Sequence, residues 1–214
     1  RVARAKTLDQ IVVATTTRAA DLPIIHLTDK LNVLFFRGSE TNVLSRYYHT
    51  AKKFSADAIV RITGDCPLID PAIIDQAIDV FKAGDYDYVS NVHVRSFPRG
   101  MDVEVFSFIA LQAAWQQAVT PYDREHVTPY IYAHPNLFKL REIVAPKALR
   151  RPELRLTVDE APDFKLVQRI YQKLYHQKPN FRLQDIIALI DRHPELKAIN
   201  QSVTQKSTPH QRLV

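Results

Sequence analysis

Hydrophobic and polar residues alternate along the first ninety residues in a way that predicts strands separated by helices. Short runs rich in apolar and β-branched residues predict strands at 11–15, 33–37, 58–63 and 86–91. Between these runs, apolar residues recur at helical spacing over 22–31, 42–54 and 71–83. Strands that alternate with helices are typical of a parallel sheet covered by helices, so the pattern predicts an α/β fold.

The predicted strand 58–63 reads Ala-Ile-Val-Arg-Ile-Thr and is almost continuously apolar or β-branched. Strands covered by helices on both faces show this pattern, so we expect a central strand. Pro71 suits the first position of the following helix, with Asp70 as its cap.

After residue 91 the pattern is less regular. Further strands are predicted at 101–106, 137–144 and 154–158, and helices at 108–118, 125–133, 162–175, 183–191 and 194–199. No linker is visible, so residues 1–200 are predicted to form one domain, followed by a polar tail over 201–214.

Composition adds limits on location and partners. No apolar run approaches the roughly 20 residues that span a bilayer, and no signal-peptide pattern is visible. The chain has a single cysteine, which excludes an internal disulfide and favours a cytoplasmic location. The net charge of +6 is spread along the chain, so no nucleic-acid-binding arm is predicted, although a basic excess suits a phosphate pocket.

Two aspartates each follow a predicted strand. Asp65 comes after Gly64 at the end of the 58–63 run, and Asp159 comes directly after 154–158. Ligands of open α/β sheets bind at the carboxyl ends of strands, and carboxylates there can hold Mg²⁺ against phosphates. The alternative is a turn or cap role for Asp65 and a helix N-cap role for Asp159. Cys66 is interpreted as a small buried filler and not as a nucleophile.

Two further segments combine acids with basic residues. Asp102 and Glu104 alternate with valines and are expected to project from one strand face, with Arg99 in the turn before them. Such a group suits sugar hydroxyls, although a polar outer face on an edge strand is the alternative. Asp123-Arg124-Glu125-His126 opens a predicted helix, where capping explains the acids but not Arg124 or His126.

The four segments around Asp65, Arg99–Glu104, Asp123–His126 and Asp159 resemble those of a known family. They are joined by Arg37-Gly38-Ser39-Glu40 and Val43-Leu44-Ser45-Arg46-Tyr47-Tyr48. Together they resemble the cytidylyltransferases that include the spore-coat polysaccharide biosynthesis proteins, relatives of the CMP-sialic acid and CMP-KDO synthetases. The resemblance covers residues 1–200. It implies a Rossmann-like nucleotide-diphospho-sugar transferase fold with a mixed, mostly parallel sheet, and CTP-dependent activation of an acidic or modified sugar with release of pyrophosphate.

The resemblance also implies roles for individual residues. Asp65 and Asp159 become the catalytic Mg²⁺ ligands. The nucleotide is expected beside Gly38, Ser39, Glu40, Arg46 and Gly64. The sugar is expected beside Arg99, Asp102, Glu104, Arg124, Glu125 and His126. The implied partners are CTP and a sugar, and a homodimer is allowed by analogy.

One departure from the family concerns the N-terminus. Family members open with a strand and a loop containing Gly, Arg and Lys that holds the nucleotide phosphates, whereas residues 1–6 resemble the end of the helix after that loop. The expectation is an N-terminally incomplete domain whose sheet lacks its first strand. The alternative is a non-catalytic nucleotide- or partner-binding module that retains the fold without the phosphate loop.

Overall fold

The computed structural model describes residues 1–204, and the chain divides into two compact units. Unit 1 comprises Arg1–Ile62, Pro71–Val94 and Val103–Ile143. Unit 2 comprises Thr63–Asp70, Arg95–Asp102 and the described residues from Val144 onward. The chain passes back and forth between the units, which is why the residue pattern contains no visible linker.

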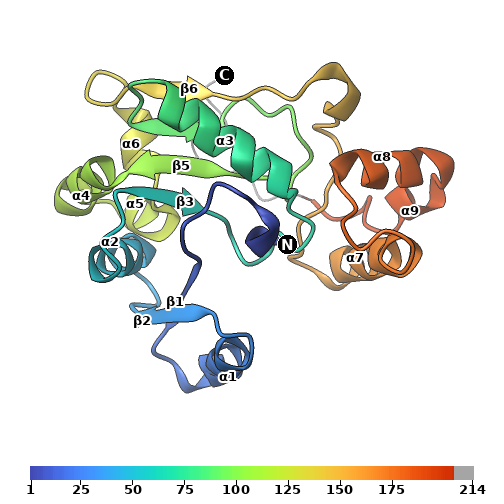
Figure 1. Ribbon diagram of the computed structural model, residues 1–214, viewed down its shortest axis with the longest axis horizontal. Helices are drawn as coiled ribbons and strands as arrows, with labels where there is room; N and C mark the ends of the chain where they lie inside the picture. Colours follow the sequence, from blue (N-terminus) through green and yellow to red (C-terminus); the bar gives the residue numbers. More distant parts are fainter. Residues whose placement is uncertain (205–214) are drawn as a thin grey trace. The chain divides into compact units, whose positions relative to one another are not determined.

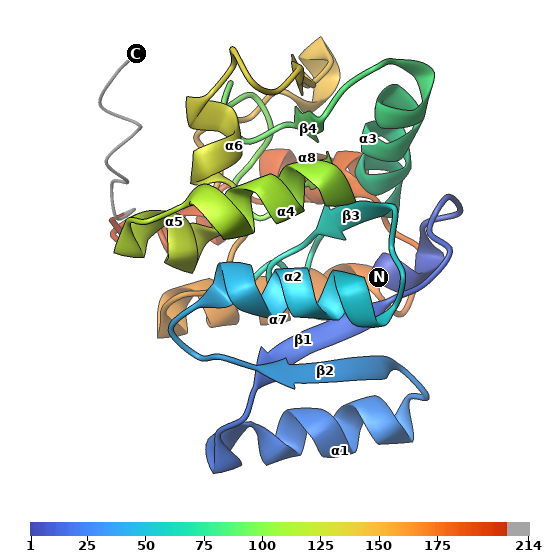
Figure 2. The same ribbon diagram turned by 90° about the vertical axis from the view of Figure 1, so that its left-hand side faces the viewer.

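Unit 1 contains a parallel pair of strands, β1 (Val12–Thr16) and β2 (Leu34–Gly38), in register from Val12 opposite Leu34 to Thr16 opposite Gly38. Helix α1 (Leu22–Lys30) connects them, and α2 (Val43–Lys53) follows β2. Figure 2 shows the strand pair lying between these two helices. This arrangement confirms the strand–helix–strand pattern predicted at the start of the chain.

Unit 1 also contains a four-stranded sheet in the order β3-β5-β4-β6. Its strands are β3 (Ala58–Arg61), β4 (Tyr88–Ser90), β5 (Glu104–Ser107) and β6 (Leu140–Glu142). Only β5 runs against the other three, because it is antiparallel to both neighbours while β4 and β6 are parallel. The mixed α/β architecture with mostly parallel strands is therefore confirmed.

The position of β3 differs from the prediction. Within residues 1–204, β3 pairs only with β5 and lies at the edge of the sheet, and its residues are exposed or half-buried. The prediction of a central strand buried on both faces is wrong for the described residues. An apolar run reports the tendency of side chains to be buried, but it carries no information about which edges find a partner strand.

Helices pack on the four-stranded sheet. Helix α3 (Pro71–Ala83) begins at Pro71 as predicted and contacts β4 and β5 (Figure 1). Helix α4 (Phe108–Gln117) is followed by two short helices, α5 (Pro121–His126) and α6 (Pro129–Ala133). A hydrophobic core joins α2, α4 and α6 to the sheet; its buried members include Leu44, Tyr48, Tyr88, Phe106, Leu111 and Ile131.

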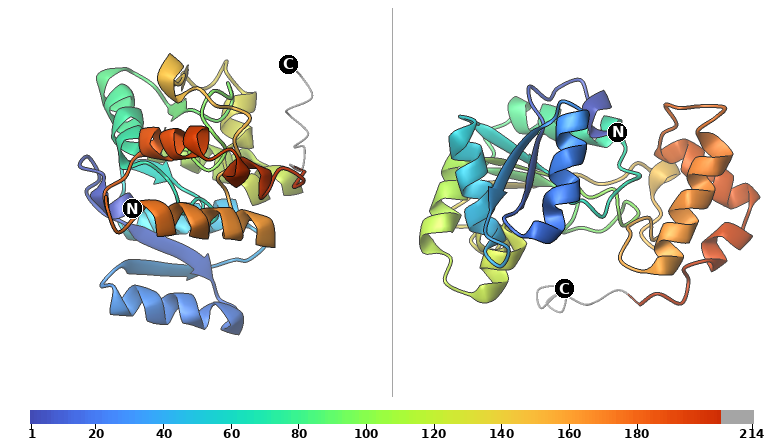
Figure 3. Two further views of the ribbon diagram at one scale, coloured as in Figure 1. Left: turned by 90° about the vertical axis from the view of Figure 1, so that its right-hand side faces the viewer. Right: turned by 90° about the horizontal axis from the view of Figure 1, so that it is seen from below.

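Unit 2 contains the helices α7 (Ala161–Leu174), α8 (Leu183–Arg192) and α9 (Glu195–Ala198), seen together in the right panel of Figure 3. The strand predicted at 154–158 is wrong, because this segment forms only an isolated bridge between Arg155 and Arg99. Asp70 accepts a hydrogen bond from the Leu183 amide at 2.7 Å, at the start of α8.

The polar tail predicted for 201–214 lies outside the described residues beyond residue 204. None of the helices formed by residues 1–204 combines the length and the apolar character that crossing a membrane requires.

Candidate active site

In unit 2, the fold brings the backbone segments of the two candidate metal ligands together. The Asp65 carbonyl oxygen accepts hydrogen bonds from the Val158 amide at 2.8 Å and the Thr157 hydroxyl at 3.1 Å. Asp159 directly follows Val158, so the loop after β3 and the segment before α7 are tied to one another. The sequence prediction that Asp65 and Asp159 belong to one site is consistent with this geometry.

The Asp65 side chain is half-buried and has partners in its own loop. Its Oδ1 accepts a hydrogen bond from the Thr63 hydroxyl, and the Cys66 Sγ lies 3.5 Å from the same oxygen. Burial raises the pKa of the Cys66 thiol to about 12, so the thiol is protonated at neutral pH. This agrees with the interpretation of Cys66 as a buried filler, because the thiolate is the nucleophilic form.

The Asp159 side chain is half-exposed and forms an ion pair with Arg155. The same guanidinium is held by Asp163, through Nε to Oδ1 at 2.9 Å and Nη2 to Oδ2 at 2.9 Å. Glu160, not Asp159, is the N-cap of α7, so the alternative that Asp159 caps this helix is wrong. The Asp159 carboxylate therefore lies beside the Arg155 guanidinium, which Asp163 also holds.

Asp163 was missed by the sequence analysis. It is 0% exposed and also accepts hydrogen bonds from the Asp159 and Glu160 amides at 3.1 Å and from the Asn200 amide group at 2.8 Å. Burial opposes its ionisation, but the bonds from Arg155 and Asn200 prevail and lower the pKa of Asp163 to about 2. The spacing of Glu160 and Asp163 around Pro162 is that of a capping box, and could have identified Asp163.

The donor set of Asp65 and Asp159 can be compared with the needs of Mg²⁺. Residues 1–204 contain no group of three or more His, Cys, Asp or Glu side chains arranged to hold a metal ion. Mg²⁺ in nucleotide-dependent enzymes is commonly bound by one or two carboxylates, with water and substrate phosphates completing its coordination. Two oxygen-donor side chains on adjoining segments fit that mode of binding.

The other candidate residues of unit 2 lie around the turn at Gly100. The Arg99 amide donates to the Leu154 carbonyl oxygen at 3.0 Å, and the Leu156 amide donates to the Arg99 carbonyl oxygen at 2.8 Å. Asp102 forms an ion pair with Arg95, which sequence reasoning missed. Burial, together with the neighbouring Arg95, lowers the pKa of Arg99. The turn thus carries two arginines and a carboxylate.

Asp102 and Glu104 were predicted to project from one face of a strand, and this is wrong. Strand β5 begins at Glu104, while Asp102 precedes the strand and belongs to unit 2. The alternation of acids and valines is present in the sequence, but Asp102 forms no strand pairing within residues 1–204, and its carboxylate instead pairs with Arg95.

Gly100 is required at this turn for two reasons. Its φ is +93°, and a Cβ there would lie 2.6 Å from the Leu156 carbonyl carbon and oxygen. We expect Gly100→Ala to lower the free energy of unfolding by roughly 1–3 kcal/mol, measured by urea denaturation.

Gly64→Ala is the matched control for this substitution, because a Cβ at Gly64 meets no atom within 4 Å and its φ is not in the left-handed region. Its free energy of unfolding is expected to stay within about 0.5 kcal/mol of the parent protein. Equal losses in the two variants would contradict the steric argument.

In unit 1, four of the five predicted nucleotide-binding residues, Gly38, Ser39, Glu40 and Arg46, lie where β2 leads into α2, whereas the fifth, Gly64, belongs to unit 2. Asn42 caps α2 by accepting a hydrogen bond from the Ser45 amide at 2.9 Å, and the Ser39 hydroxyl accepts from the Asn42 amide at 3.0 Å. Arg46 donates from Nη1 to the Ser39 carbonyl oxygen. A Cβ on Gly38 would lie 3.1 Å from the Arg46 Cγ, so glycine lets Arg46 lie close to the end of β2.

The charged groups at this loop differ in how they are paired. Glu40 forms an exposed ion pair with Arg18. The Nε of Arg46 is buried and has no hydrogen-bond partner within residues 1–204. Burial lowers the pKa of Arg46. An arginine N–H group left without a protein acceptor is suited to a phosphate oxygen.

The remaining candidates lie on β5 and α5. Glu104 is 4% exposed, and its Oε1 accepts hydrogen bonds from the Tyr88 and Thr128 hydroxyls, each at 2.6 Å. Its Oε2 is paired with Arg61. Arg124, Glu125 and His126 lie on α5, which packs on α2, the helix that carries Arg46. Unit 1 therefore places these three residues on a helix that packs against α2.

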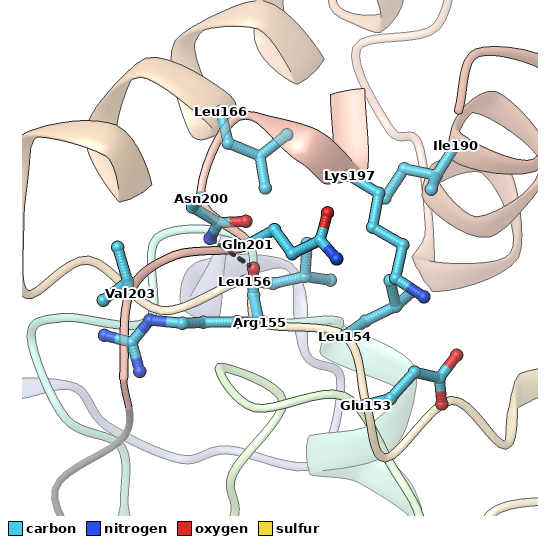
Figure 4. Close-up of a pocket in the computed structure, with 10 residues that line it drawn as sticks. All are labelled: Glu153, Leu154, Arg155, Leu156, Leu166, Ile190, Lys197, Asn200, Gln201 and Val203. Carbon is cyan, nitrogen blue, oxygen red and sulfur yellow. Dashed lines mark hydrogen bonds between the residues drawn. The ribbon is translucent and has the colours of Figure 1, made fainter. Parts of the chain in front are cut away.

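A separate pocket lies in unit 2 and contains none of the candidate residues predicted from the sequence. In Figure 4, Asn200 donates a hydrogen bond to the Arg155 carbonyl oxygen, at 3.1 Å. The lining residues are Glu153, Leu154, Arg155, Leu156, Leu166, Ile190, Lys197, Asn200, Gln201 and Val203. The pocket belongs to the packing of α7–α9 around the segment before Asp159.

Comparisons with known proteins concern the family of the chain and not the individual site residues. A family model described as cytidylyltransferase matches residues 1–187. An uncharacterised protein of Methanocaldococcus jannaschii is 43% identical over 207 residues, which are 97% of this chain and 83% of that protein. The spore coat polysaccharide biosynthesis protein SpsF of Bacillus subtilis is 32% identical over 193 residues, which are 89% of this chain and 78% of SpsF.

Solved structures give the same result. A cytidylyltransferase from Leptospira borgpetersenii serovar Hardjo-bovis matches with a TM-score of 0.86 and 31% identity, covering 96% of this chain and 86% of that one. The CTP complex of CMP:2-keto-3-deoxy-manno-octonic acid synthetase matches with a TM-score of 0.57 and 14% identity, covering 81% of this chain and 85% of that one, which shows a shared fold. The chain belongs to the cytidylyltransferase family, whose enzymes are nucleotidyltransferases.

Proposed function

We propose that this protein is a CTP-dependent sugar nucleotidyltransferase that transfers CMP to an acidic or modified sugar in surface polysaccharide biosynthesis. The observation that carries the proposal is the pair of hydrogen bonds from Thr157 and Val158 to the Asp65 carbonyl oxygen, because these bonds join the segments that carry the two carboxylates, Asp65 and Asp159. The relationship to SpsF supports the polysaccharide context.

In the proposed reaction, a hydroxyl oxygen of the sugar forms a bond to the α-phosphorus of CTP. The bond from that phosphorus to the oxygen bridging to the β-phosphate breaks, pyrophosphate leaves, and the hydroxyl proton passes to solvent. Mg²⁺, held by Asp65 and Asp159, would neutralise charge that develops on the phosphate oxygens.

The chain's own residues supply binding and orientation. The loop from Gly38 to Glu40 and the guanidinium of Arg46 are assigned to the nucleotide. Arg99 and Asp102 on the Gly100 turn, and Arg124, Glu125 and His126 on α5, are assigned to the sugar. Transfer of this kind depends mostly on positioning and electrostatic stabilisation, because fixed charged groups need little reorganisation when the reaction occurs.

The test is a pyrophosphate-release assay on the product of the complete reading frame. Each of the four nucleoside triphosphates is supplied with Mg²⁺ and a panel of acidic, amino and neutral sugars. We expect release with CTP and at least one acidic or modified sugar, and about tenfold less or none with the other nucleotides.

Calorimetric titration with CTP distinguishes the alternative. CTP binding with no pyrophosphate release across the whole panel would contradict the enzyme and favour a non-catalytic nucleotide-binding module. Preference for a nucleotide other than CTP would contradict the proposed substrate.

A further inference from the structure

The carboxylate of Glu104 is held in unit 1 by groups from several elements. Arg61 on β3 donates to Oε2, while Tyr88 on β4 and Thr128 between α5 and α6 donate to Oε1. Burial opposes ionisation, but the Arg61 guanidinium prevails and lowers the pKa of Glu104, so the buried group is a carboxylate at neutral pH. Its bond from Thr128 is therefore charge-assisted, which makes it stronger than a bond between neutral groups.

The residue before Thr128 has an unusual backbone conformation. Val127 has φ of +75° and ψ of −58°, and the Thr128 amide donates to the His126 carbonyl oxygen at 2.9 Å. These values describe a γ-turn of the rare, strained kind, and a β-branched residue adopts a positive φ only when its surroundings impose it. The turn ends α5 directly after His126.

Two contacts within unit 1 hold the residues of the strained turn. The Val127 side chain is 0% exposed and belongs to the hydrophobic core with Leu44 and Ile131. The Thr128 hydroxyl is fixed on Glu104. The first contact is the apolar packing of Val127, and the second is the hydrogen bond from Thr128 to the Glu104 carboxylate. The two contacts therefore hold successive residues of the strained turn.

We propose that Glu104, acting through Thr128, is a positioning residue: it holds the strained turn at Val127 and so fixes the direction in which α5 presents Arg124, Glu125 and His126. Arg61 keeps Glu104 ionised, and the Tyr88 hydroxyl donates a second hydrogen bond to Oε1. The link to catalysis rests on the proposed function, in which α5 contacts the sugar. Glu104 then acts on the sugar indirectly, in place of the direct contact predicted from the sequence.

A purely structural role for Glu104 would have different consequences. Loss of the Thr128 bond would then loosen the whole of unit 1 evenly and would affect the handling of CTP and of the sugar alike. In the positioning role, the effect is confined to α5 and to the sugar, because the predicted nucleotide loop is held by its own bonds to Ser39, from the Asn42 amide and from Arg46.

The experiment compares Thr128→Val, which keeps the shape and removes the hydroxyl, with Thr128→Ser, which keeps the hydroxyl. The first readout is amide hydrogen exchange of α5, with α3 as the internal reference. We expect about tenfold faster exchange in α5 for Thr128→Val and no change in α3, with Thr128→Ser close to the parent protein.

The second readout is steady-state kinetics. Thr128→Val is expected to raise KM for the sugar about tenfold while KM for CTP stays within about twofold, and Thr128→Ser is expected to restore the parent value. Unchanged exchange in α5, equal acceleration in α3 and α5, or failure of Thr128→Ser to restore α5 would each overturn the positioning role. These outcomes do not depend on turnover, so they remain distinct from failure of the proposed function.

Discussion

Asp65→Asn is expected to lower kcat for pyrophosphate release by about 10²–10³-fold, with little change in folding. Asparagine keeps the size of the side chain and can still accept the bond from Thr63, and the backbone bonds from Val158 and Thr157 do not involve the side chain. The substitution removes the negative charge that is proposed to hold Mg²⁺. The measurement is the initial rate at saturating CTP and sugar, together with the urea midpoint.

Asp57→Asn is the matched control. Asp57 is an exposed aspartate directly before β3, whereas Asp65 follows β3. The control therefore makes the same chemical change near the opposite end of this strand. Activity within about twofold of the parent is expected for this control. The assignment of Asp65 fails if its variant retains more than about a tenth of the activity, or if Mn²⁺ binding in the presence of CTP is equal in both variants.

The sequence pattern predicted the parts of the fold that depend on side-chain periodicity. The first two strands and helices α1 to α4 were found close to their predicted positions, because each presents apolar residues at a regular spacing. The helix predicted at 125–133 is instead two helices separated at Val127. Valine gives no local indication of a positive φ, and this break depends on Glu104, which is distant in the sequence.

In the candidate site, too, local patterns predicted some features, while features that depend on contacts between distant residues were missed. The carboxyl-end rule predicted Asp65 and Asp159 as ligands, although the strand predicted before Asp159 does not form. The hydrogen bond from Thr157 to Asp65 joins residues 92 positions apart, and no local pattern predicts such a bond. Arg95 and Arg155 were missed because each arginine is defined by an acid that it meets only in the folded chain. Asp163 was also missed, although its capping-box spacing was visible in the sequence.

Asp163→Asn is expected to lower the free energy of unfolding at pH 7 by about 3 kcal/mol, measured by urea denaturation. The substitution removes a buried charge that pairs with Arg155 and accepts bonds from two amides at the start of α7. Arg155 keeps its contact with Asp159, which places the expected loss at the lower end of the range for broken buried pairs.

Asp185→Asn is the matched control, because Asp185 occupies the same capping position at the start of α8, where it accepts a bond from the Arg182 amide at 2.8 Å. Its ion-pair partner, Lys178, is exposed, so a loss of about 1 kcal/mol is expected. Equal losses in the two variants would show that burial of the Arg155–Asp163 pair adds nothing to capping.

Asp163 also makes part of the protein's stability sensitive to acid. Because the folded-state pKa of Asp163 is about 2 against an ordinary value of 3.8, the carboxylate is favoured by folding. This contribution, about 2 kcal/mol, is fully present above about pH 4 and is lost as the pH falls toward 2. Asp163→Asn lacks the titrating group, so the difference in unfolding free energy between parent and variant should shrink between pH 5 and pH 2.5. A difference that stays constant over this range would show that Asp163 is not the group responsible.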